Sequence, residues 1–275
     1  MSNHHRTADR LTILFSGILC AFCLMVVFLI TSIEAVTYWT PEYYEKEYTR
    51  YQVLEDLPDM TMDDLLFVTD EMMSYLRGKR DDLQVIITTI DGEKREFFSD
   101  REIAHMTDVK KLFSGGLWLR RIGILFLLLT AVCLFFWQKR HTDRRHLLAR
   151  LMPYSLCMGT GIFFTVALIL TVIISTDFTK YFLVFHHILF DNTLWILYPD
   201  EDLMINMLPE PFFIDTALRI AAIFGGLVLI FFSSAFFSGG GTSKRPDSPC
   251  GIYFFESLTF FHFFDIFNIG KNKIG

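Results

Sequence analysis

The sequence predicts an all-α membrane protein: a bundle of four transmembrane helices that carries a small α+β cap outside the cytoplasm. Two observations predict this class. First, 52% of the 275 residues are hydrophobic and 30 are phenylalanine, which is more apolar than a soluble domain requires. Second, four apolar runs reach the roughly 20 residues that cross a bilayer as a helix. These runs cover residues 11–33, 117–137, 151–175 and 214–237.

Lysine and arginine residues set the expected orientation, because they concentrate on the cytoplasmic side of membrane proteins. The N-terminus carries Arg6 and Arg10, and the short loop 138–150 is rich in basic residues. We therefore expect both of these segments in the cytoplasm, and the acidic segments 34–116 and 176–213 outside it. Four spans then leave both termini in the cytoplasm. The net charge of −6, without a large basic patch, excludes a nucleic-acid binder.

The first span is expected to remain as a membrane helix. Its apolar run is too long for the central region of a signal peptide, and Leu19 before Cys20 is not the small residue that processing requires.

The segment 34–116 is too long for a simple connector, and its signals predict a cap of helix, hairpin and helix. Its opening, "TYWTPEYYEKEYTRY", has the tyrosines and tryptophan typical of the headgroup layer. Thr61 and Asp64 form a capping-box pattern, and the helix that follows ends at Gly78. "LQVIITTI", the turn "DG" and "EKREFF" predict a hairpin. A second capping box, Ser99 with Glu102, begins a helix that leads into the second span.

The tail 238–275 begins with a polar linker and continues with a Phe-rich run interrupted by Glu256, His262 and Asp265. This run is too short and too charged for a fifth span, so we expect the tail to lie at the membrane surface.

Histidines in the two outer segments are the candidate chemical groups. His105 and Asp108 lie three residues apart on the predicted helix, so Asp108 is expected to hold one nitrogen of His105 and raise the basicity of the other. His186 and His187 follow the third span inside the apolar stretch "VFHHILFDN". They are interpreted either as interfacial anchors or as groups that transfer protons to a lipid-borne substrate. No phosphate-binding loop, G-x-S-x-G or H-E-x-x-H motif accompanies them.

Three motifs resemble those of the lipoprotein intramolecular transacylase family of Gram-positive bacteria. They are "REIAHMTDVK" at 101–110, "FHHILFDNTLWIL" at 185–197 and "INMLPEPFF" at 205–213. The resemblance covers the chain from about Arg10 to Phe237. It implies four membrane helices with an extracytoplasmic cap, and its two functional histidines match His105 and His186. His187 falls at a variable position of the motif, and the Phe-rich tail departs from the short basic end usual in the family.

The resemblance implies an acyltransferase that moves the sn-2 acyl chain of a diacylglyceryl-cysteine onto the α-amino group of the same cysteine. One histidine would act as base and the other as acid, with no covalent acyl-enzyme and no cofactor or metal. Asn192 or Trp195 would donate a hydrogen bond to the developing oxyanion. The expected partners are diacylglyceryl-modified lipoproteins and membrane lipids, and the expected state is a monomer in the cell membrane.

Two other functions remain compatible with the residues. A non-enzymatic membrane sensor would use the acidic cap to bind a peptide or an ion, and it would tolerate loss of both histidines. A metal-dependent lipid hydrolase would combine His105, His186 or His187 and a carboxylate as zinc ligands, and it would lose activity to a chelator.

Overall fold

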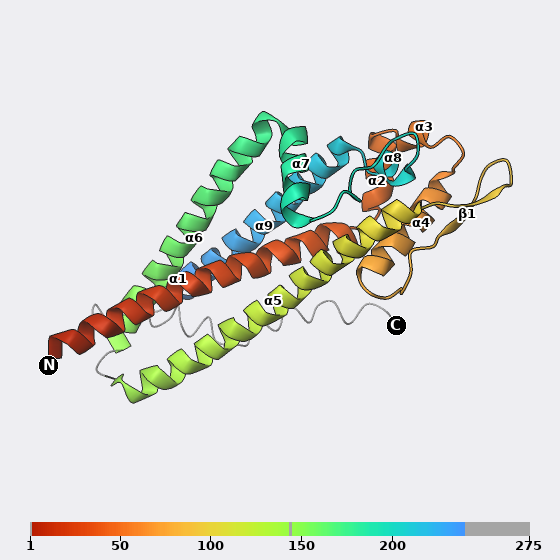
Figure 1. The fold of residues 1–275 in the computed structure, drawn as a ribbon. Helices are drawn as coiled ribbons and strands as arrows, with labels where there is room; N and C mark the ends of the chain where they lie inside the picture. Colours follow the sequence, from red (N-terminus) through yellow and green to blue (C-terminus); the bar gives the residue numbers. More distant parts are fainter. Residues whose placement is uncertain (1, 143–144, 240–275) are drawn as a thin grey trace. The chain divides into compact units, whose positions relative to one another are not determined.

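The computed structural model describes residues 2–142 and 145–239, which are mostly helical (Figure 1). The prediction for the tail beyond residue 239 lies outside the described residues. The four long helices are α1 (Ser2–Glu34), α5 (Asp100–Arg140), α6 (Arg145–Thr176) and α9 (Glu210–Gly239). Each contains a stretch long and apolar enough to cross a membrane, which confirms the predicted set of four.

Helix α5 is longer than a bilayer requires. Its 41 residues extend for about 60 Å, whereas the hydrocarbon core is about 30 Å thick. Charged residues occur in its first turns up to Lys111 and again at Arg120 and Arg121, and the run without charged residues covers 122–137. The first turns of α5, which include His105, therefore lie before the membrane-crossing part of the helix.

The described residues form two compact units, and the four long helices contribute to both. Of the described residues, the first unit contains 2–29, 120–142, 145–169 and 224–239. Small residues allow α1 and α6 to approach closely there. A Cβ atom added to Gly159 would lie 2.7 Å from the Cβ of Ala21, and one added to Gly17 would overlap Ser155. Gly17 and Ala21, like Ser155 and Gly159, are four residues apart, which is the spacing typical of close helix pairs in membranes.

The second unit contains residues 30–119 and 170–223, and it holds the largest hydrophobic core. Its shorter elements, in chain order, are the π-helical turn η1 (Ala35–Trp39), α2 (Tyr43–Arg50), α3 (Val53–Asp56), α4 (Met62–Leu76), β1 (Ile86–Thr88), β2 (Lys94–Glu96), α7 (Phe178–Leu189) and α8 (Leu203–Met207). The strands β1 and β2 form an antiparallel pair in which Ile86 lies opposite Glu96 and Thr88 opposite Lys94. Gly92, with φ of +86°, makes the predicted turn between them.

Both predicted capping boxes are present in this unit. The Thr61 side chain accepts from the Asp64 backbone, and Asp64 accepts from Thr61 in return. At the start of α5, the Ser99 N–H donates to Glu102 over 2.7 Å, and the Glu102 N–H donates to Ser99 Oγ over 3.3 Å. The helix, hairpin and helix expected for residues 61–113 are therefore confirmed.

The headgroup-layer interpretation of the segment after the first span was wrong for two of its tyrosines. Trp39 is exposed, but Tyr43 and Tyr48 on α2 are buried, with 2% and 0% of their surface accessible. The Tyr48 hydroxyl is 2.7 Å from that of Thr69, and its ring stacks on Phe212. Tyrosine suits both the headgroup layer and a protein core, and here the core of the second unit contains these rings.

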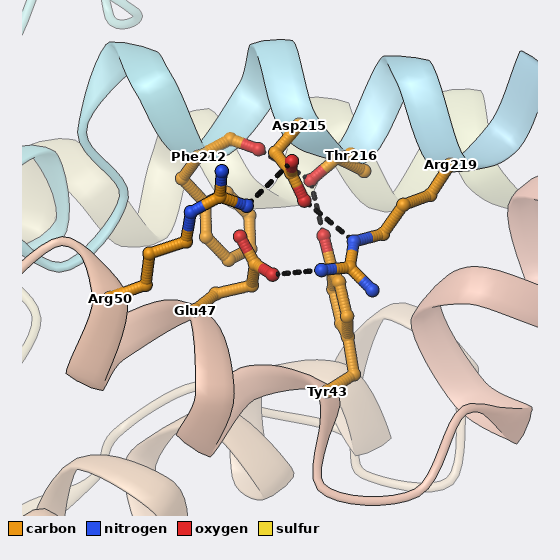
Figure 2. A network of polar contacts seen from close by, with 7 residues as sticks. All are labelled: Tyr43, Glu47, Arg50, Phe212, Asp215, Thr216 and Arg219. Carbon is orange, nitrogen blue, oxygen red and sulfur yellow. Dashed lines mark hydrogen bonds and ion pairs between the residues drawn. The ribbon is translucent and has the colours of Figure 1, made fainter.

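A polar network joins α2 to the first turns of α9 (Figure 2). Asp215 accepts from Arg50 over 2.9 Å and from Arg219 over 2.6 Å. Arg219 also donates to Glu47 over 2.7 Å, although Glu47 is only 1% exposed. The hydroxyls of Tyr43 and Thr216 meet beside this network. These contacts fix the start of α9 against α2.

Candidate functional site

His186 belongs to an aromatic stripe along one face of α7. The helix begins after Asp177, whose carboxylate accepts from the Lys180 N–H over 3.0 Å. Phe178, Phe182, His186 and Phe190 follow at intervals of four residues, so they share a face. The ring of Phe182 stacks on that of Phe178 and lies 4.4 Å from that of His186. This face is turned inward, and His186 is buried as a result.

The backbone fixes the tautomer of neutral His186. Its Nδ1 lies 2.7 Å from the carbonyl oxygen of Phe182. A carbonyl can only accept a hydrogen bond, so Nδ1 carries the proton and Nε2 keeps its lone pair. His186 can therefore accept a proton at Nε2.

His105 lies in the second turn of α5 and is also buried. Its ring centroid is 6.1 Å from that of His186. Phe190 contacts both imidazoles, at 5.1 Å from His105 and 5.7 Å from His186. Nδ1 of His105 is buried and has no hydrogen-bond partner among the described residues. The structure thus brings together the two histidines that the sequence places 81 positions apart (186 − 105).

Burial keeps both histidines neutral near pH 7. It lowers the pKa of His105 to about 4, with the charge of His186 adding to the shift and Asp108 opposing it. Burial also lowers the pKa of His186, against the opposing effect of the hydrogen bond to Phe182. Two adjacent imidazoles in an apolar site disfavour the charged form of either one.

Asp108 does not hold a nitrogen of His105, contrary to the expectation from their spacing. Its Oδ1 accepts from Lys111 over 2.9 Å, and its Oδ2 accepts from Asn192 over 2.9 Å. These two hydrogen bonds lower the pKa of Asp108. Asp108 therefore ties α5 to the loop after α7, and it acts on His105 only through its charge.

Trp195 was predicted as an oxyanion donor, but its single N–H is already engaged. It donates to the backbone oxygen of Asn192 over 2.8 Å. The indole ring stacks on His186, with 5.0 Å between centroids and 30° between planes. Asn192 in turn uses one amide hydrogen on Asp108, and its Oδ1 accepts from the Leu194 N–H. Asp108, Asn192 and Trp195 thus form a chain of contacts that ends against His186.

His187 differs from His186 in its surroundings. It is exposed, its Nδ1 lies 2.9 Å from the oxygen of Leu183, and its ring meets the edge of Trp195. Adjacent residues of a helix point about 100° apart, so His187 lies away from the stripe that carries His186.

Sequence reasoning missed Glu102 as a support of the site. This residue is fully buried, and beyond its capping bond to Ser99 it accepts from the Met204 N–H over 2.6 Å. Ser99 also donates to Asp202 over 2.9 Å. The capping box predicted the local bond, but the contacts with residues 202–204 are long-range and leave no local signal. They fix the first turn of α5, one turn before His105.

Among the residues that the structure describes, no three His, Cys, Asp or Glu side chains come together in a group able to hold a metal ion.

Comparison with known proteins identifies the family. The family model "Lipoprotein intramolecular transacylase Lit" matches residues 18–213, more than half of the chain. The chain is 22% identical to the solved structure of the membrane-integral transacylase Lit from Bacillus cereus, with a TM-score of 0.59 over 82% of this chain and 94% of that one. Two further structures of that protein, each with one histidine replaced, match with TM-scores of 0.60 at 23% and 22% identity. They cover 83% and 84% of this chain, and 92% and 94% of their own.

A search of curated proteins gives no match. The solved structures support the membrane fold, and the family model covers both candidate histidines and all three motifs noted in the sequence. The chain therefore belongs to the lipoprotein intramolecular transacylase family, whose members are membrane-integral acyltransferases.

Proposed function

We propose that this chain transfers the sn-2 acyl group of a diacylglyceryl-cysteine lipoprotein to the α-amino group of the same cysteine, with His105 and His186 as the acid–base pair. The observation that carries the proposal is the pair itself: two buried imidazoles whose centroids are 6.1 Å apart. Histidine is the side chain best suited to take and return a proton near neutral pH.

The reaction needs one proton to move between two atoms of the same substrate. The neutral amine attacks the ester carbonyl, a nitrogen–carbon bond forms, and the amine nitrogen gives up a proton. The sn-2 carbon–oxygen bond then breaks, and the glycerol oxygen takes a proton. The histidine pair accepts the first proton and returns one to the oxygen, so the enzyme is unchanged at the end.

His186 is the better candidate for the base. Its Nδ1–H is held by the carbonyl of Phe182, which leaves Nε2 available and raises its basicity. Its low exposure also keeps it unprotonated before the substrate binds. Because amine and ester belong to one molecule, proximity supplies much of the remaining barrier reduction, and no acyl-enzyme is needed.

The proposed orientation places residues 34–116 and 176–213 outside the cytoplasm, with loop 138–150 and both termini inside. The basic residues of loop 138–150 and of the N-terminus support it. The substrate would then reach the histidines from the outer leaflet.

Single substitutions of the histidines test the proposal. In a host without this activity, His105→Ala and His186→Ala should each reduce the N-acylated lyso-lipoprotein by about 10²–10⁴-fold, because each removes one proton-transfer partner. The readout is mass spectrometry of lipoprotein N-termini. His187→Ala is the matched control, since it changes the adjacent exposed imidazole and should retain most activity.

Other outcomes would favour the alternatives. A membrane sensor would leave lipoprotein N-termini unchanged whether or not the chain is present. A lipid hydrolase would release free fatty acid without acylating the amine. If His187→Ala abolishes the product and His186→Ala does not, the acid–base role belongs to His187 and its assignment to His186 is wrong.

A further inference from the structure

The face of α7 opposite the aromatic stripe is apolar and uncovered. Val184, Phe185 and Ile188 are 42%, 53% and 75% exposed. These three residues share one face of the helix, whereas His186 points inward from the other. A helix with apolar residues on both faces needs an apolar environment on both faces.

Helix α7 begins next to the end of a membrane helix. Thr176 is the last residue of α6, Phe178 is the first of α7, and only Asp177 separates them. The final turns of α6 also expose apolar side chains, including Val172 at 56% and Ile174 at 39%. The exposed apolar surface of the membrane-crossing helix thus continues directly along the chain into α7.

Two exposed polar residues of α7 share an edge beside this face. Lys180 and His187 are exposed and lie seven residues apart, so they fall on the same edge two turns apart. A short helix with one apolar face and one polar edge that carries a cation is the pattern of a helix that lies in the interface plane of a membrane.

We propose that α7 is an interfacial helix whose outer face, Val184, Phe185 and Ile188, lies against the acyl chains of the bilayer lipids. The occupant is lipid because this surface continues that of α6, which crosses the same lipid. Lys180 and His187 then face the headgroups. The arrangement places His186 at the depth where acyl esters of membrane lipids lie, although the location of α7 does not itself depend on catalysis by His186.

Spin-label accessibility in proteoliposomes tests this location. A nitroxide is attached at Ile188→Cys in a chain whose five native cysteines are replaced by alanine. Collisions with oxygen should exceed collisions with a water-soluble nickel chelate at this position. Leu168→Cys on α6, 65% exposed, is the lipid-facing control, and Ile90→Cys at the hairpin, 64% exposed, is the water-facing one. Lys180→Cys should show more chelate contact than Ile188→Cys on the same helix.

Two results would overturn the proposal. Equal chelate accessibility at positions 188 and 90 would place α7 in water, and poor access by both reagents at position 188 would place another protein surface there. If the cysteine-free chain does not fold, a photoreactive benzoylphenylalanine at position 188 of the native chain replaces the measurement. It should add the mass of a lipid on irradiation, and the same group at position 90 should not. Because neither readout measures acyl transfer, failure here leaves the catalytic proposal to its own test.

Discussion

Burial of neutral His105 should make the stability of the protein fall in mild acid. The folded state holds the pKa of His105 at about 4, whereas an unfolded chain would have the ordinary value of 6.5. Between these values the unfolded state binds more protons, so stability rises with pH across this window and is lost as the pH falls through it. Between about pH 7.5 and about pH 5, the free energy of unfolding should fall by about 2 kcal/mol. This value follows from the extra protonation of His105 in the unfolded chain, compared with the folded chain, at the lower pH.

The matched variant is His105→Phe, which keeps an aromatic ring beside His186 and Phe190 but cannot bind a proton. Thermal unfolding in detergent is measured for both proteins at about pH 7.5 and about pH 5. For a chain of this size the wild type should lose about 4–8 °C more than the variant. Taking the difference between the two proteins removes the contribution of titrating groups that do not interact with His105.

His187→Phe is the control for the substitution itself, and because His187 is exposed this variant should respond to pH as the wild type does. If wild type and His105→Phe lose the same stability in acid, His105 is not held neutral by burial. The electrostatic description of the site would then be wrong, whatever the activity of the variant.

Three further predictions concern the supports of the fold and the site. Trp195→Phe keeps an aromatic ring stacked on His186 but removes the hydrogen bond to Asn192. Initial acyl-transfer rates should therefore fall by up to about tenfold. A loss as complete as that of His186→Ala would instead show that the indole N–H takes part in the reaction. Arg219→Gln leaves buried Glu47 without its cation and should lower the free energy of unfolding by about 1–3 kcal/mol. This is less than the usual loss for a broken buried ion pair, because the Arg219 side chain is itself 42% exposed. Arg50→Gln removes the ion pair with Asp215 and should cost less than about 1 kcal/mol, because the Arg50 side chain is 57% exposed. Equal losses for the two variants would contradict the role given to Glu47. Gly159→Val should destabilise the close pair of α1 and α6 by about 1–3 kcal/mol. Gly161→Val should have little effect, because no other described segment lies within 4 Å of a Cβ added there, and similar melting temperatures for the two variants would show that α6 can shift away.

Features with a local signal were predictable from the sequence. The membrane helices follow from runs of apolar residues, and the capping boxes at Thr61 and Ser99 follow from residues three apart. The hairpin follows from the Asp91–Gly92 turn between two short strands. Helix α7 was not predicted, although it has a local signal of the same kind, because Asp177 directly precedes an apolar run and caps it. In each case the residues that determine the element lie close together along the chain.

Contacts between distant segments were not predictable in the same way. The spacing of His105 and Asp108 permits a contact, but Asn192, 84 positions away, takes one carboxylate oxygen and Lys111 takes the other. Trp195 has one N–H, and the nearby carbonyl of Asn192 binds it before any substrate does. Hydrogen-bonding groups engage the partner that the tertiary fold places closest, so residue type and spacing alone could not assign these roles.

The imidazoles of His186 and His105 are held in place by different kinds of contact. His186 is fixed by a backbone hydrogen bond and by the stacked indole of Trp195. His105 is fixed by packing, and its buried Nδ1 has no partner among the described residues. Leaving such an atom unsatisfied costs about 1–3 kcal/mol, and an apolar side chain in its place would avoid that cost. In the proposed reaction, a bound substrate would supply the partner that this nitrogen lacks among the described residues.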